Sequence, residues 1–175
     1  MKTLYLLRHA KSDWGDPGLA DHDRPLAPRG QTAAPRVAAV MAHEGLVPAH
    51  VLCSTATRAR ETWDLIAETW GTPVPFETRR AIYDADGGDL IAMAQRLDEA
   101  LPSAMLVGHN PAMEEAAARL AGDGAPDALQ ALAGKYPTAA LAVLTFPGES
   151  WRAVRPGAGT LTRFLRPKDL PPAAV

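Results

Sequence analysis

Short apolar runs alternate with longer amphipathic segments along most of the chain. Runs that are too short for helices and end in charged or turn residues predict buried strands. These runs are Thr3–Leu7, His50–Cys53, Val74–Phe76 and Met105–Val107. In the longer segments the apolar residues recur at helical spacing, which predicts helices. The predicted helices cover Gly30–Glu44, Thr57–Trp70, Asp89–Leu101, Pro111–Leu120 and Asp127–Ala133.

This alternation of strands and helices is typical of an α/β fold. We therefore expect three layers, in which helices cover both faces of a mostly parallel central sheet. Two later apolar segments, Ala140–Phe146 and Trp151–Val154, flank a turn with Pro and Gly and predict a hairpin that adds an antiparallel edge. The segment Lys11–Arg29 is polar and contains several Gly, Pro and Asp residues, so it is interpreted as a loop.

The length and composition fit one domain with a substantial core. The chain has 175 residues, of which 47% are hydrophobic and 22% are charged. We assign residues 1–166 to a single domain. Residues 167–175 are rich in Pro and Ala, and we expect them to form a C-terminal tail at the surface.

Charge and cysteine content narrow the expected partners and location. The 18 basic and 20 acidic side chains give a net charge of −2, which argues against a nucleic-acid partner because such proteins carry a basic excess. No uncharged apolar run approaches the roughly 20 residues that cross a bilayer, so no membrane association is expected. The single cysteine, Cys53, excludes an intrachain disulfide, and we expect a cytoplasmic protein.

Polar residues follow three of the predicted strands at the point where each strand ends. Arg8 and His9 follow the first, Arg58 comes shortly after the second, and His109 and Asn110 follow the fourth. Open α/β sheets place ligand sites at the carboxyl ends of their strands, so these side chains converge if the strands are neighbours. Two arginines and two histidines suit a phosphoryl group, because guanidinium forks bind its oxygens and a neutral imidazole can attack its phosphorus.

Other interpretations of these residues remain open at this point. Taken singly, a histidine at a strand end is more often a half-buried hydrogen-bonded residue, and an arginine at a helix start is usually an ion-pair partner. Four residues separate Cys53 from Arg58, one fewer than in the phosphate-binding loop of cysteine phosphatases. The cluster Asp21, His22 and Asp23 lacks the second His or Cys cluster that a metal site needs. Because the arginines already supply positive charge, we expect no metal and no cofactor.

Three ordered motifs resemble those of the histidine phosphatase (phosphoglycerate-mutase-like) superfamily. Residues 7–12 (Leu-Arg-His-Ala-Lys-Ser) resemble its Arg-His-Gly signature, residues 54–62 (Ser-Thr-Ala-Thr-Arg-Ala-Arg-Glu-Thr) its second motif, and residues 107–110 (Val-Gly-His-Asn) its third. Residues 24–26 (Arg-Pro-Leu) are similar to its Pro-Leu-Thr segment. The short length, the first motif and residues 135–138 (Lys-Tyr-Pro-Thr) most resemble the SixA-like phosphohistidine phosphatase branch. The resemblance implies a phosphoglycerate-mutase-like α/β fold for the catalytic domain, residues 1–166.

The resemblance also implies a role for each matching residue. His9 is expected to be the phosphorylated nucleophile, while Arg8, Arg58 and His109 are expected to hold the phosphoryl oxygens. The residues expected to bind substrate are Arg8, Arg58, His109, Ser12 and Asn110. Where phosphoglycerate mutases have an asparagine after the signature, this chain has Gly15, so one phosphate contact of those enzymes is not carried over.

Members of the superfamily often have an acidic residue, the general acid, between the second and third motifs. The acidic residues considered in that interval are Glu77, Asp84, Asp86 and Asp89. Asp84 is our choice, although acids beside two glycines are commonly plain loop residues. SixA-like proteins can also work without such an acid, because an imidazole leaving group can be protonated on nitrogen before cleavage.

The implied function is a metal-independent phosphatase with a covalent phospho-His9 intermediate. Nothing between Arg58 and His109 is long enough for a deep lid, and a shallow site admits a phosphorylated side chain of another protein. Protein phosphohistidine is therefore the expected substrate. Two alternatives stay open, namely a phosphatase for small phosphate monoesters and a phosphate-binding module without catalysis.

Overall fold

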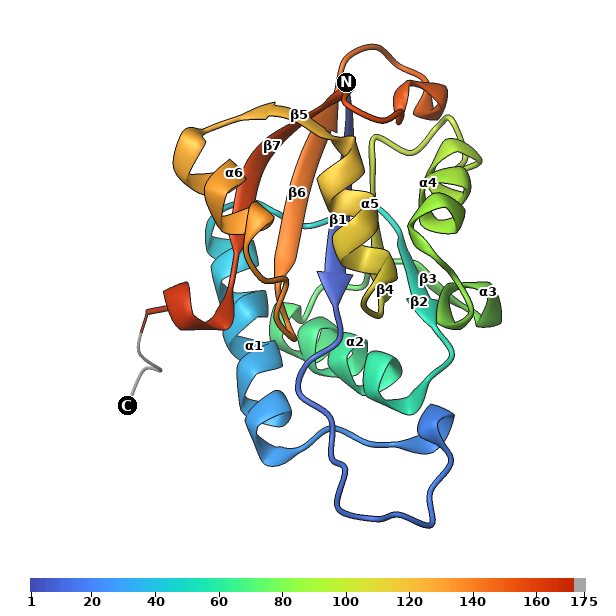
Figure 1. Cartoon of the computed structure of the whole chain (residues 1–175), viewed down its shortest axis with the longest axis vertical. Coiled ribbons are helices and arrows are strands. Elements are labelled where there is room, and N and C mark those ends of the chain that lie inside the picture. The colour runs from blue at the N-terminus through green and yellow to red at the C-terminus, as the bar shows by residue number, and fades with distance from the viewer. Residues whose placement is uncertain (172–175) are drawn as a thin grey trace.

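A single seven-stranded sheet runs through the middle of the computed structural model, which describes residues 1–171 (Figure 1). Its strands are β1 (Lys2–Arg8), β2 (Val51–Ser54), β3 (Phe76–Arg79), β4 (Ser103–Gly108), β5 (Ala121–Gly124), β6 (Leu141–Phe146) and β7 (Gly159–Leu165). They are ordered β3-β2-β4-β1-β6-β7-β5. Only β6 runs against its neighbours β1 and β7, so the sheet is mostly parallel, as the sequence predicts.

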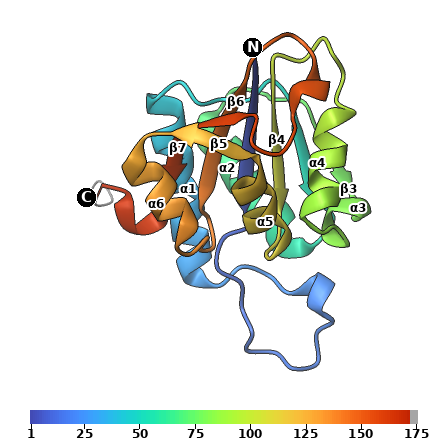
Figure 2. The ribbon, with the colours of Figure 1, turned by 45° about the horizontal axis from the view of Figure 1, so that its top comes forward.

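Helices cover both faces of this sheet and complete three layers (Figure 2). On one face lie α1 (Pro28–His43) and α2 (Thr57–Trp70), which pack against each other. The other face carries α4 (Gly87–Gln95), α5 (Ala112–Leu120) and α6 (Pro126–Ala133). Short helical segments complete the structure: η1 (Asp21–Asp23), α3 (Arg80–Tyr83), η2 (Trp151–Ala153) and η3 (Pro167–Asp169).

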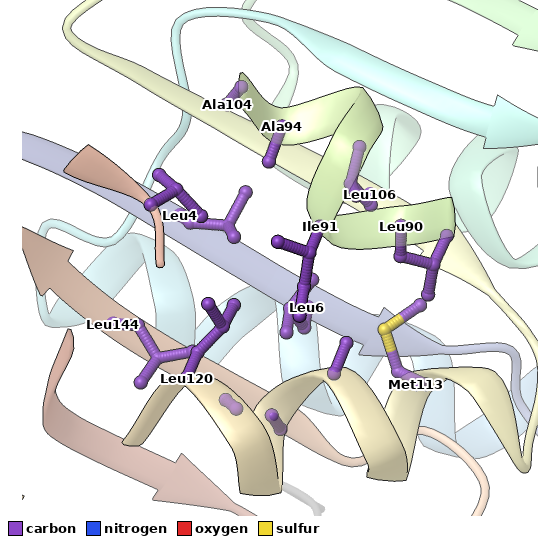
Figure 3. Packing of buried hydrophobic residues seen from close by; sticks show 14 of the residues in the cluster. Leu4, Leu6, Leu90, Ile91, Ala94, Ala104, Leu106, Met113, Leu120 and Leu144 are labelled. Atoms are coloured by element: carbon purple, nitrogen blue, oxygen red, sulfur yellow. The ribbon is translucent and has the colours of Figure 1, made fainter. Parts of the chain in front are cut away.

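The apolar run of β1 is continuous because both faces of this strand are buried. Leu4 and Leu6 belong to the core beneath α4 and α5, where they lie near Ile91 (Figure 3). Tyr5 and Leu7 belong to the opposite core, beneath α1 and α2. Strands that are buried on both faces read as unbroken hydrophobic runs. The central position of β1 places its carboxyl end, and the residues that follow it, in the middle of one sheet edge.

The predicted C-terminal hairpin is wrong in two respects. Strand β6 is not an edge strand, because it pairs with β1 inside the sheet and five of its six residues are buried. Its hairpin partner is β7, while residues 151–153 form η2 instead of a strand. The Trp151 indole is fully buried and donates to the Leu101 carbonyl (3.0 Å), which holds this segment against the core and off the sheet.

Three further differences concern the ends of the sheet and the chain. Strand β5 has the sequence Ala-Gly-Asp-Gly, which carries no apolar pattern, and it was not predicted. The predicted helix Asp89–Leu101 starts earlier and ends at Gln95. In the predicted tail, Leu170 is buried against the α1–α2 core, whereas residues 172–175 lie outside the described residues. Within residues 1–171, no helix has both the length and the apolar character that a membrane crossing needs.

Candidate active site

A cavity of about 340 Å³ opens where three neighbouring parallel strands, β2, β4 and β1, end. Its lining comes mainly from the segments that directly follow these strands and from the loop between β1 and α1. The lining residues are Arg8, His9, Lys11, Ser12, Trp14, Asp21, Arg58, His109, Asn110 and Thr138. The structure therefore brings six of the seven residues predicted for the site together, and the exception is Asp84.

His9 lies at the base of the cavity and is only 6% exposed. Its Nδ1 is 2.6 Å from the Ala10 carbonyl oxygen, which can only accept a hydrogen bond. Nδ1 therefore carries the proton and Nε2 carries the free lone pair in the neutral ring. Burial lowers the pKa of His9 to about 3; the hydrogen bond to Ala10 opposes this effect, whereas the nearby His109 ring and the Arg58 and Arg8 guanidinium groups add to it.

The ring of His109 lies beside that of His9, with 5.2 Å between the ring centres. Its Nε2 is hydrogen-bonded to the hydroxyl of Ser54, the last residue of β2, at 2.8 Å. Its Nδ1 is buried and has no hydrogen-bond partner among the described residues. Burial, as the larger cause, and the Arg58 guanidinium together lower the pKa of His109 to about 4. Both imidazoles are therefore neutral at pH 7 in the unliganded protein.

The two arginines are fixed by main-chain acceptors. Arg8 Nη1 donates to the Tyr136 carbonyl (2.9 Å), and its buried Nε has no partner among the described residues. Arg58 stands in the first turn of α2, is 7% exposed, and donates through Nη1 to the Asp21 carbonyl (2.7 Å). Desolvation lowers the pKa of Arg8, but its ordinary value is so high that the guanidinium stays charged. The cavity thus carries permanent positive charge beside two neutral imidazoles.

The two remaining predicted substrate contacts also reach the cavity. Ser12 is buried and forms an isolated β-bridge with Leu26, which ties the start of the β1–α1 loop to its end. The Asn110 amide donates through Nδ2 to the Tyr136 carbonyl (3.0 Å), the same oxygen that accepts from Arg8. One main-chain oxygen therefore orients a side chain from each of two strand ends.

Asp21 is one of four lining residues, with Lys11, Trp14 and Thr138, that the sequence does not predict for the site. Its Oδ2 accepts from Arg58 Nη2 (3.1 Å) and from the Tyr83 hydroxyl (2.6 Å). These two donors hold the pKa of the Asp21 carboxyl below its usual range, with the Tyr83 bond as the larger cause. From the sequence, the Asp21-His22-Asp23 cluster suggests only a metal site that lacks its remaining ligands. Among residues 1–171, no three His, Cys, Asp or Glu side chains are grouped to hold a metal ion.

The structure places Asp84, the predicted general acid, outside the cavity lining. Its side chain is exposed, lies 3.4 Å from Arg80 Nε, and lines a separate hollow beside α4. Helix α3 ends at Tyr83, and it is Tyr83 that contacts the site, with its ring edge-on to His109 at 5.4 Å. The other acids of the interval are engaged elsewhere, because Glu77 pairs with Arg79, and Asp86 and Asp89 form the capping box of α4.

Cys53 takes no part in the cavity. The thiol is fully buried within β2, and desolvation raises its pKa to about 12. A thiol in that state is a poor nucleophile at neutral pH, because the thiolate is the reactive form.

This mostly parallel α/β sheet, with two histidines and two arginines at the carboxyl ends of its central strands, is that of a phosphoglycerate-mutase-like protein. Residues 4–105 match the family described as the histidine phosphatase superfamily (branch 1). The chain therefore belongs to this superfamily. It is 38% identical over 164 residues to the uncharacterized protein Rv1276c of Mycobacterium tuberculosis. The aligned region covers 93% of this chain and all of Rv1276c.

Solved structures identify the branch within the superfamily. The SixA structure from Agrobacterium tumefaciens is 32% identical, with a TM-score of 0.78 over 94% of this chain and 97% of that one. A SixA structure from Nakamurella is 26% identical, with a TM-score of 0.79 over 95% and 96% of the two chains. These similarities confirm the SixA-like branch and the fold predicted from the motifs, and they identify the protein as a phosphatase.

Proposed function

We propose that this protein removes the phosphoryl group from protein phosphohistidine through a phosphorylated His9, without a metal ion. The observation that carries the proposal is the hydrogen bond from His9 Nδ1 to the Ala10 carbonyl. It leaves the Nε2 lone pair free in a ring that stays neutral at physiological pH and lines the same cavity as Arg8, Arg58 and His109. A neutral, oriented imidazole beside fixed cations is what attack on phosphorus requires.

In the first step, the Nε2 lone pair of His9 forms a bond to phosphorus while the bond between phosphorus and the leaving nitrogen breaks. The leaving imidazole keeps the electron pair of that bond and departs as a neutral ring, because its other nitrogen already carries a proton. Arg8 and Arg58 stabilise the charge on the transferring oxygens. The buried Nε of Arg8 and Nδ1 of His109, which lack partners among the described residues, are suited to donate to these oxygens.

In the second step, water attacks phosphorus and the bond to His9 Nε2 breaks, which returns the electron pair to the ring. The proton lost by the water is taken up by the released phosphate or by solvent. The two steps together convert phosphohistidine and water into histidine and inorganic phosphate, and His9 ends in its starting state.

The carboxyl group in the cavity favours a nitrogen leaving group over an alcohol. An alkoxide is a poor leaving group unless an acid protonates it, and Asp21 stays ionised because Tyr83 and Arg58 donate to it. Asp84 does not line the cavity. A protonated phosphoimidazole needs no such acid, which supports phosphohistidine over small phosphate monoesters as substrate.

The test is labelling and turnover with a radiolabelled phosphohistidine peptide. We expect acid-labile, base-stable label on the wild-type protein and a turnover loss of about 10³-fold or more in His9→Asn. His43→Asn changes an exposed histidine at the end of α1 and should leave both readouts unchanged. Full turnover by His9→Asn refutes the mechanism. Faster turnover of sugar phosphates than of the peptide favours the small-monoester alternative, and phosphate binding without turnover favours the non-catalytic one.

A further inference from the structure

One large aromatic side chain at the cavity has no role in the mechanism above. Trp14 lines the cavity and is 61% exposed, whereas Trp63 and Trp151 are buried in the core. It lies on the β1–α1 loop, residues 9–27, which extends past the carboxyl edge of the sheet (Figures 1 and 2). An exposed tryptophan beside a ligand cavity is more often a contact for that ligand than part of a core.

The loop holds the indole in a fixed position. The Arg24 guanidinium lies over the ring of Trp14, 4.1 Å from its centre, and covers one face. On either side of Trp14, the Asp13 amide donates to the Pro25 carbonyl (2.8 Å) and the Gly15 amide donates to the Asp13 carboxylate (2.7 Å). A side chain held in this way binds a ligand with little loss of conformational entropy.

The cavity lining includes two groups of different chemistry. Arg8, His9, Arg58 and His109 provide the cations and nitrogens that suit the phosphoryl group. Trp14 provides an aromatic carbon surface, which offers nothing to anionic oxygens but stacks well on another flat ring. The second group therefore suits the part of the substrate from which the phosphoryl group is removed.

We propose that Trp14 stacks on the planar leaving group and so makes the site selective for phosphoryl groups attached to a flat ring. This specificity role rests on the proposed function, because it names the side chain that receives the imidazole of phosphohistidine. Offset stacking of two rings corresponds to about 3- to 10-fold in binding. An aliphatic or ring-free phosphoryl donor gains nothing from it.

The test is a binding comparison that does not depend on turnover. Phenylphosphonate and methylphosphonate both present a phosphoryl-like dianion, and only the first carries a ring on phosphorus. We expect the wild-type protein to bind phenylphosphonate about 3- to 10-fold more tightly than methylphosphonate by calorimetry. Trp14→Ala should abolish this preference, and Trp14→Phe should retain most of it. The matched control is Phe76→Ala, an exposed aromatic at the amino end of β3, which should leave the preference unchanged.

The kinetic counterpart compares N-phosphoimidazole with phosphoramidate, which has the same P–N bond and no ring. Trp14→Ala should lower the ratio of the two kcat/KM values about 3- to 10-fold. Equal losses on both donors, or a preference for phenylphosphonate that survives in Trp14→Ala, overturn the proposal for Trp14. Failure to label His9 overturns the proposed function instead, and the phosphonate comparison still decides the role of Trp14.

Discussion

At the scale of single residues, the site depends on which neighbour each polar atom has. The Ala10 carbonyl fixes the His9 tautomer, and the Tyr136 carbonyl orients both Arg8 and Asn110. These acceptors are main-chain oxygens, so changes of their side chains do not remove them. Asp21 is different, because its carboxylate forms an ion pair with Arg58 inside a site proposed to bind a dianion.

Arg58 and Asp21 should therefore show strong coupling. We expect Arg58→Ala to lower kcat/KM on a phosphohistidine peptide about 10²- to 10³-fold, because it removes a cation and leaves the Asp21 carboxylate to repel the substrate. Adding Asp21→Asn should restore roughly 10-fold of that loss, since much of the effect of breaking such a pair comes from the unpaired charge. Steady-state kinetics of the two single variants and the double variant measure this.

The matched control for these variants is the surface ion pair of Arg163 with Glu44, whose charged atoms are 2.9 Å apart and do not line the cavity. Arg163→Ala should leave kcat/KM unchanged. If Asp21→Asn instead deepens the loss caused by Arg58→Ala, the Asp21 carboxylate contributes favourably to the reaction and our account of its charge is wrong.

At the scale of elements, the sequence predicted the parts of the site that are local to strand ends. Arg8, His9 and His109 stand where apolar runs stop abruptly, and parallel neighbours bring such positions to one edge. The sequence does not predict Asp21 or Tyr83, because Asp21 lines the cavity from the β1–α1 loop and Tyr83 contacts Asp21 from α3, and neither segment has a periodic pattern. The contact between them joins positions 62 residues apart, which no local pattern encodes.

The same limit explains the error in the hairpin. Residues 151–154 have the apolar composition of a strand, but the fully buried Trp151 holds them against the core. The pattern of β6 does not show which strand lies beside it, because a buried strand looks alike at any interior position. The order in which strands pair is a property of the assembled sheet, and the local sequence pattern therefore does not predict it.

The packing of α1 against the loop after β1 gives a prediction at this scale. A Cβ added to Gly30 would lie 2.2 Å from the Lys11 carbonyl oxygen, far inside contact distance. Gly30→Ala should therefore push the first motif outward, lower the free energy of unfolding by about 1–3 kcal/mol and reduce turnover. Urea denaturation and peptide turnover measure the two effects.

Gly88→Ala, in α4, is the control for Gly30→Ala, because the structure has room for the added methyl group at this position. A Cβ at Gly88 meets its nearest atoms at 3.4 and 3.5 Å, which is ordinary contact. This variant should be stabilised by about 0.5–1 kcal/mol, because alanine loses less entropy than glycine when a helix forms. Equal stability of the Gly30→Ala variant and the wild-type protein would show that the loop can move away from α1 without cost.

At the scale of the whole molecule, folding keeps two imidazoles neutral that are free to titrate in the unfolded chain. The cavity lies between the two helical layers at one sheet edge, so desolvation acts on both rings. The ordinary histidine pKa is 6.5, and in the folded protein it is lowered to about 3 for His9 and about 4 for His109. Neutral histidines suit the mechanism, but they make the fold sensitive to acid.

Proton binding determines how the stability changes with pH. Above pH 6.5 both histidines are neutral in the folded and in the unfolded protein, so they do not change the free energy of unfolding. Below pH 6.5 the unfolded chain binds more protons than the folded protein. Stability is therefore lost as the pH falls from 6.5 towards 4 and 3. At pH 5 the loss is at most about 2 kcal/mol for each histidine, from about 1.4 kcal/mol per pKa unit.

Urea denaturation at pH 8 and pH 5 measures this loss. The double variant His9→Asn/His109→Asn should lose less stability between the two pH values than the wild-type protein, by up to about 4 kcal/mol. His43→Asn, at the exposed end of α1, should behave like the wild-type protein. A saturating dianion such as tungstate should also reduce the loss at pH 5, because its charge raises the pKa of His109 in the folded state. If the double variant is as acid-sensitive as the wild-type protein, the two rings are not held neutral by burial, and the tautomer argument for His9 fails with them.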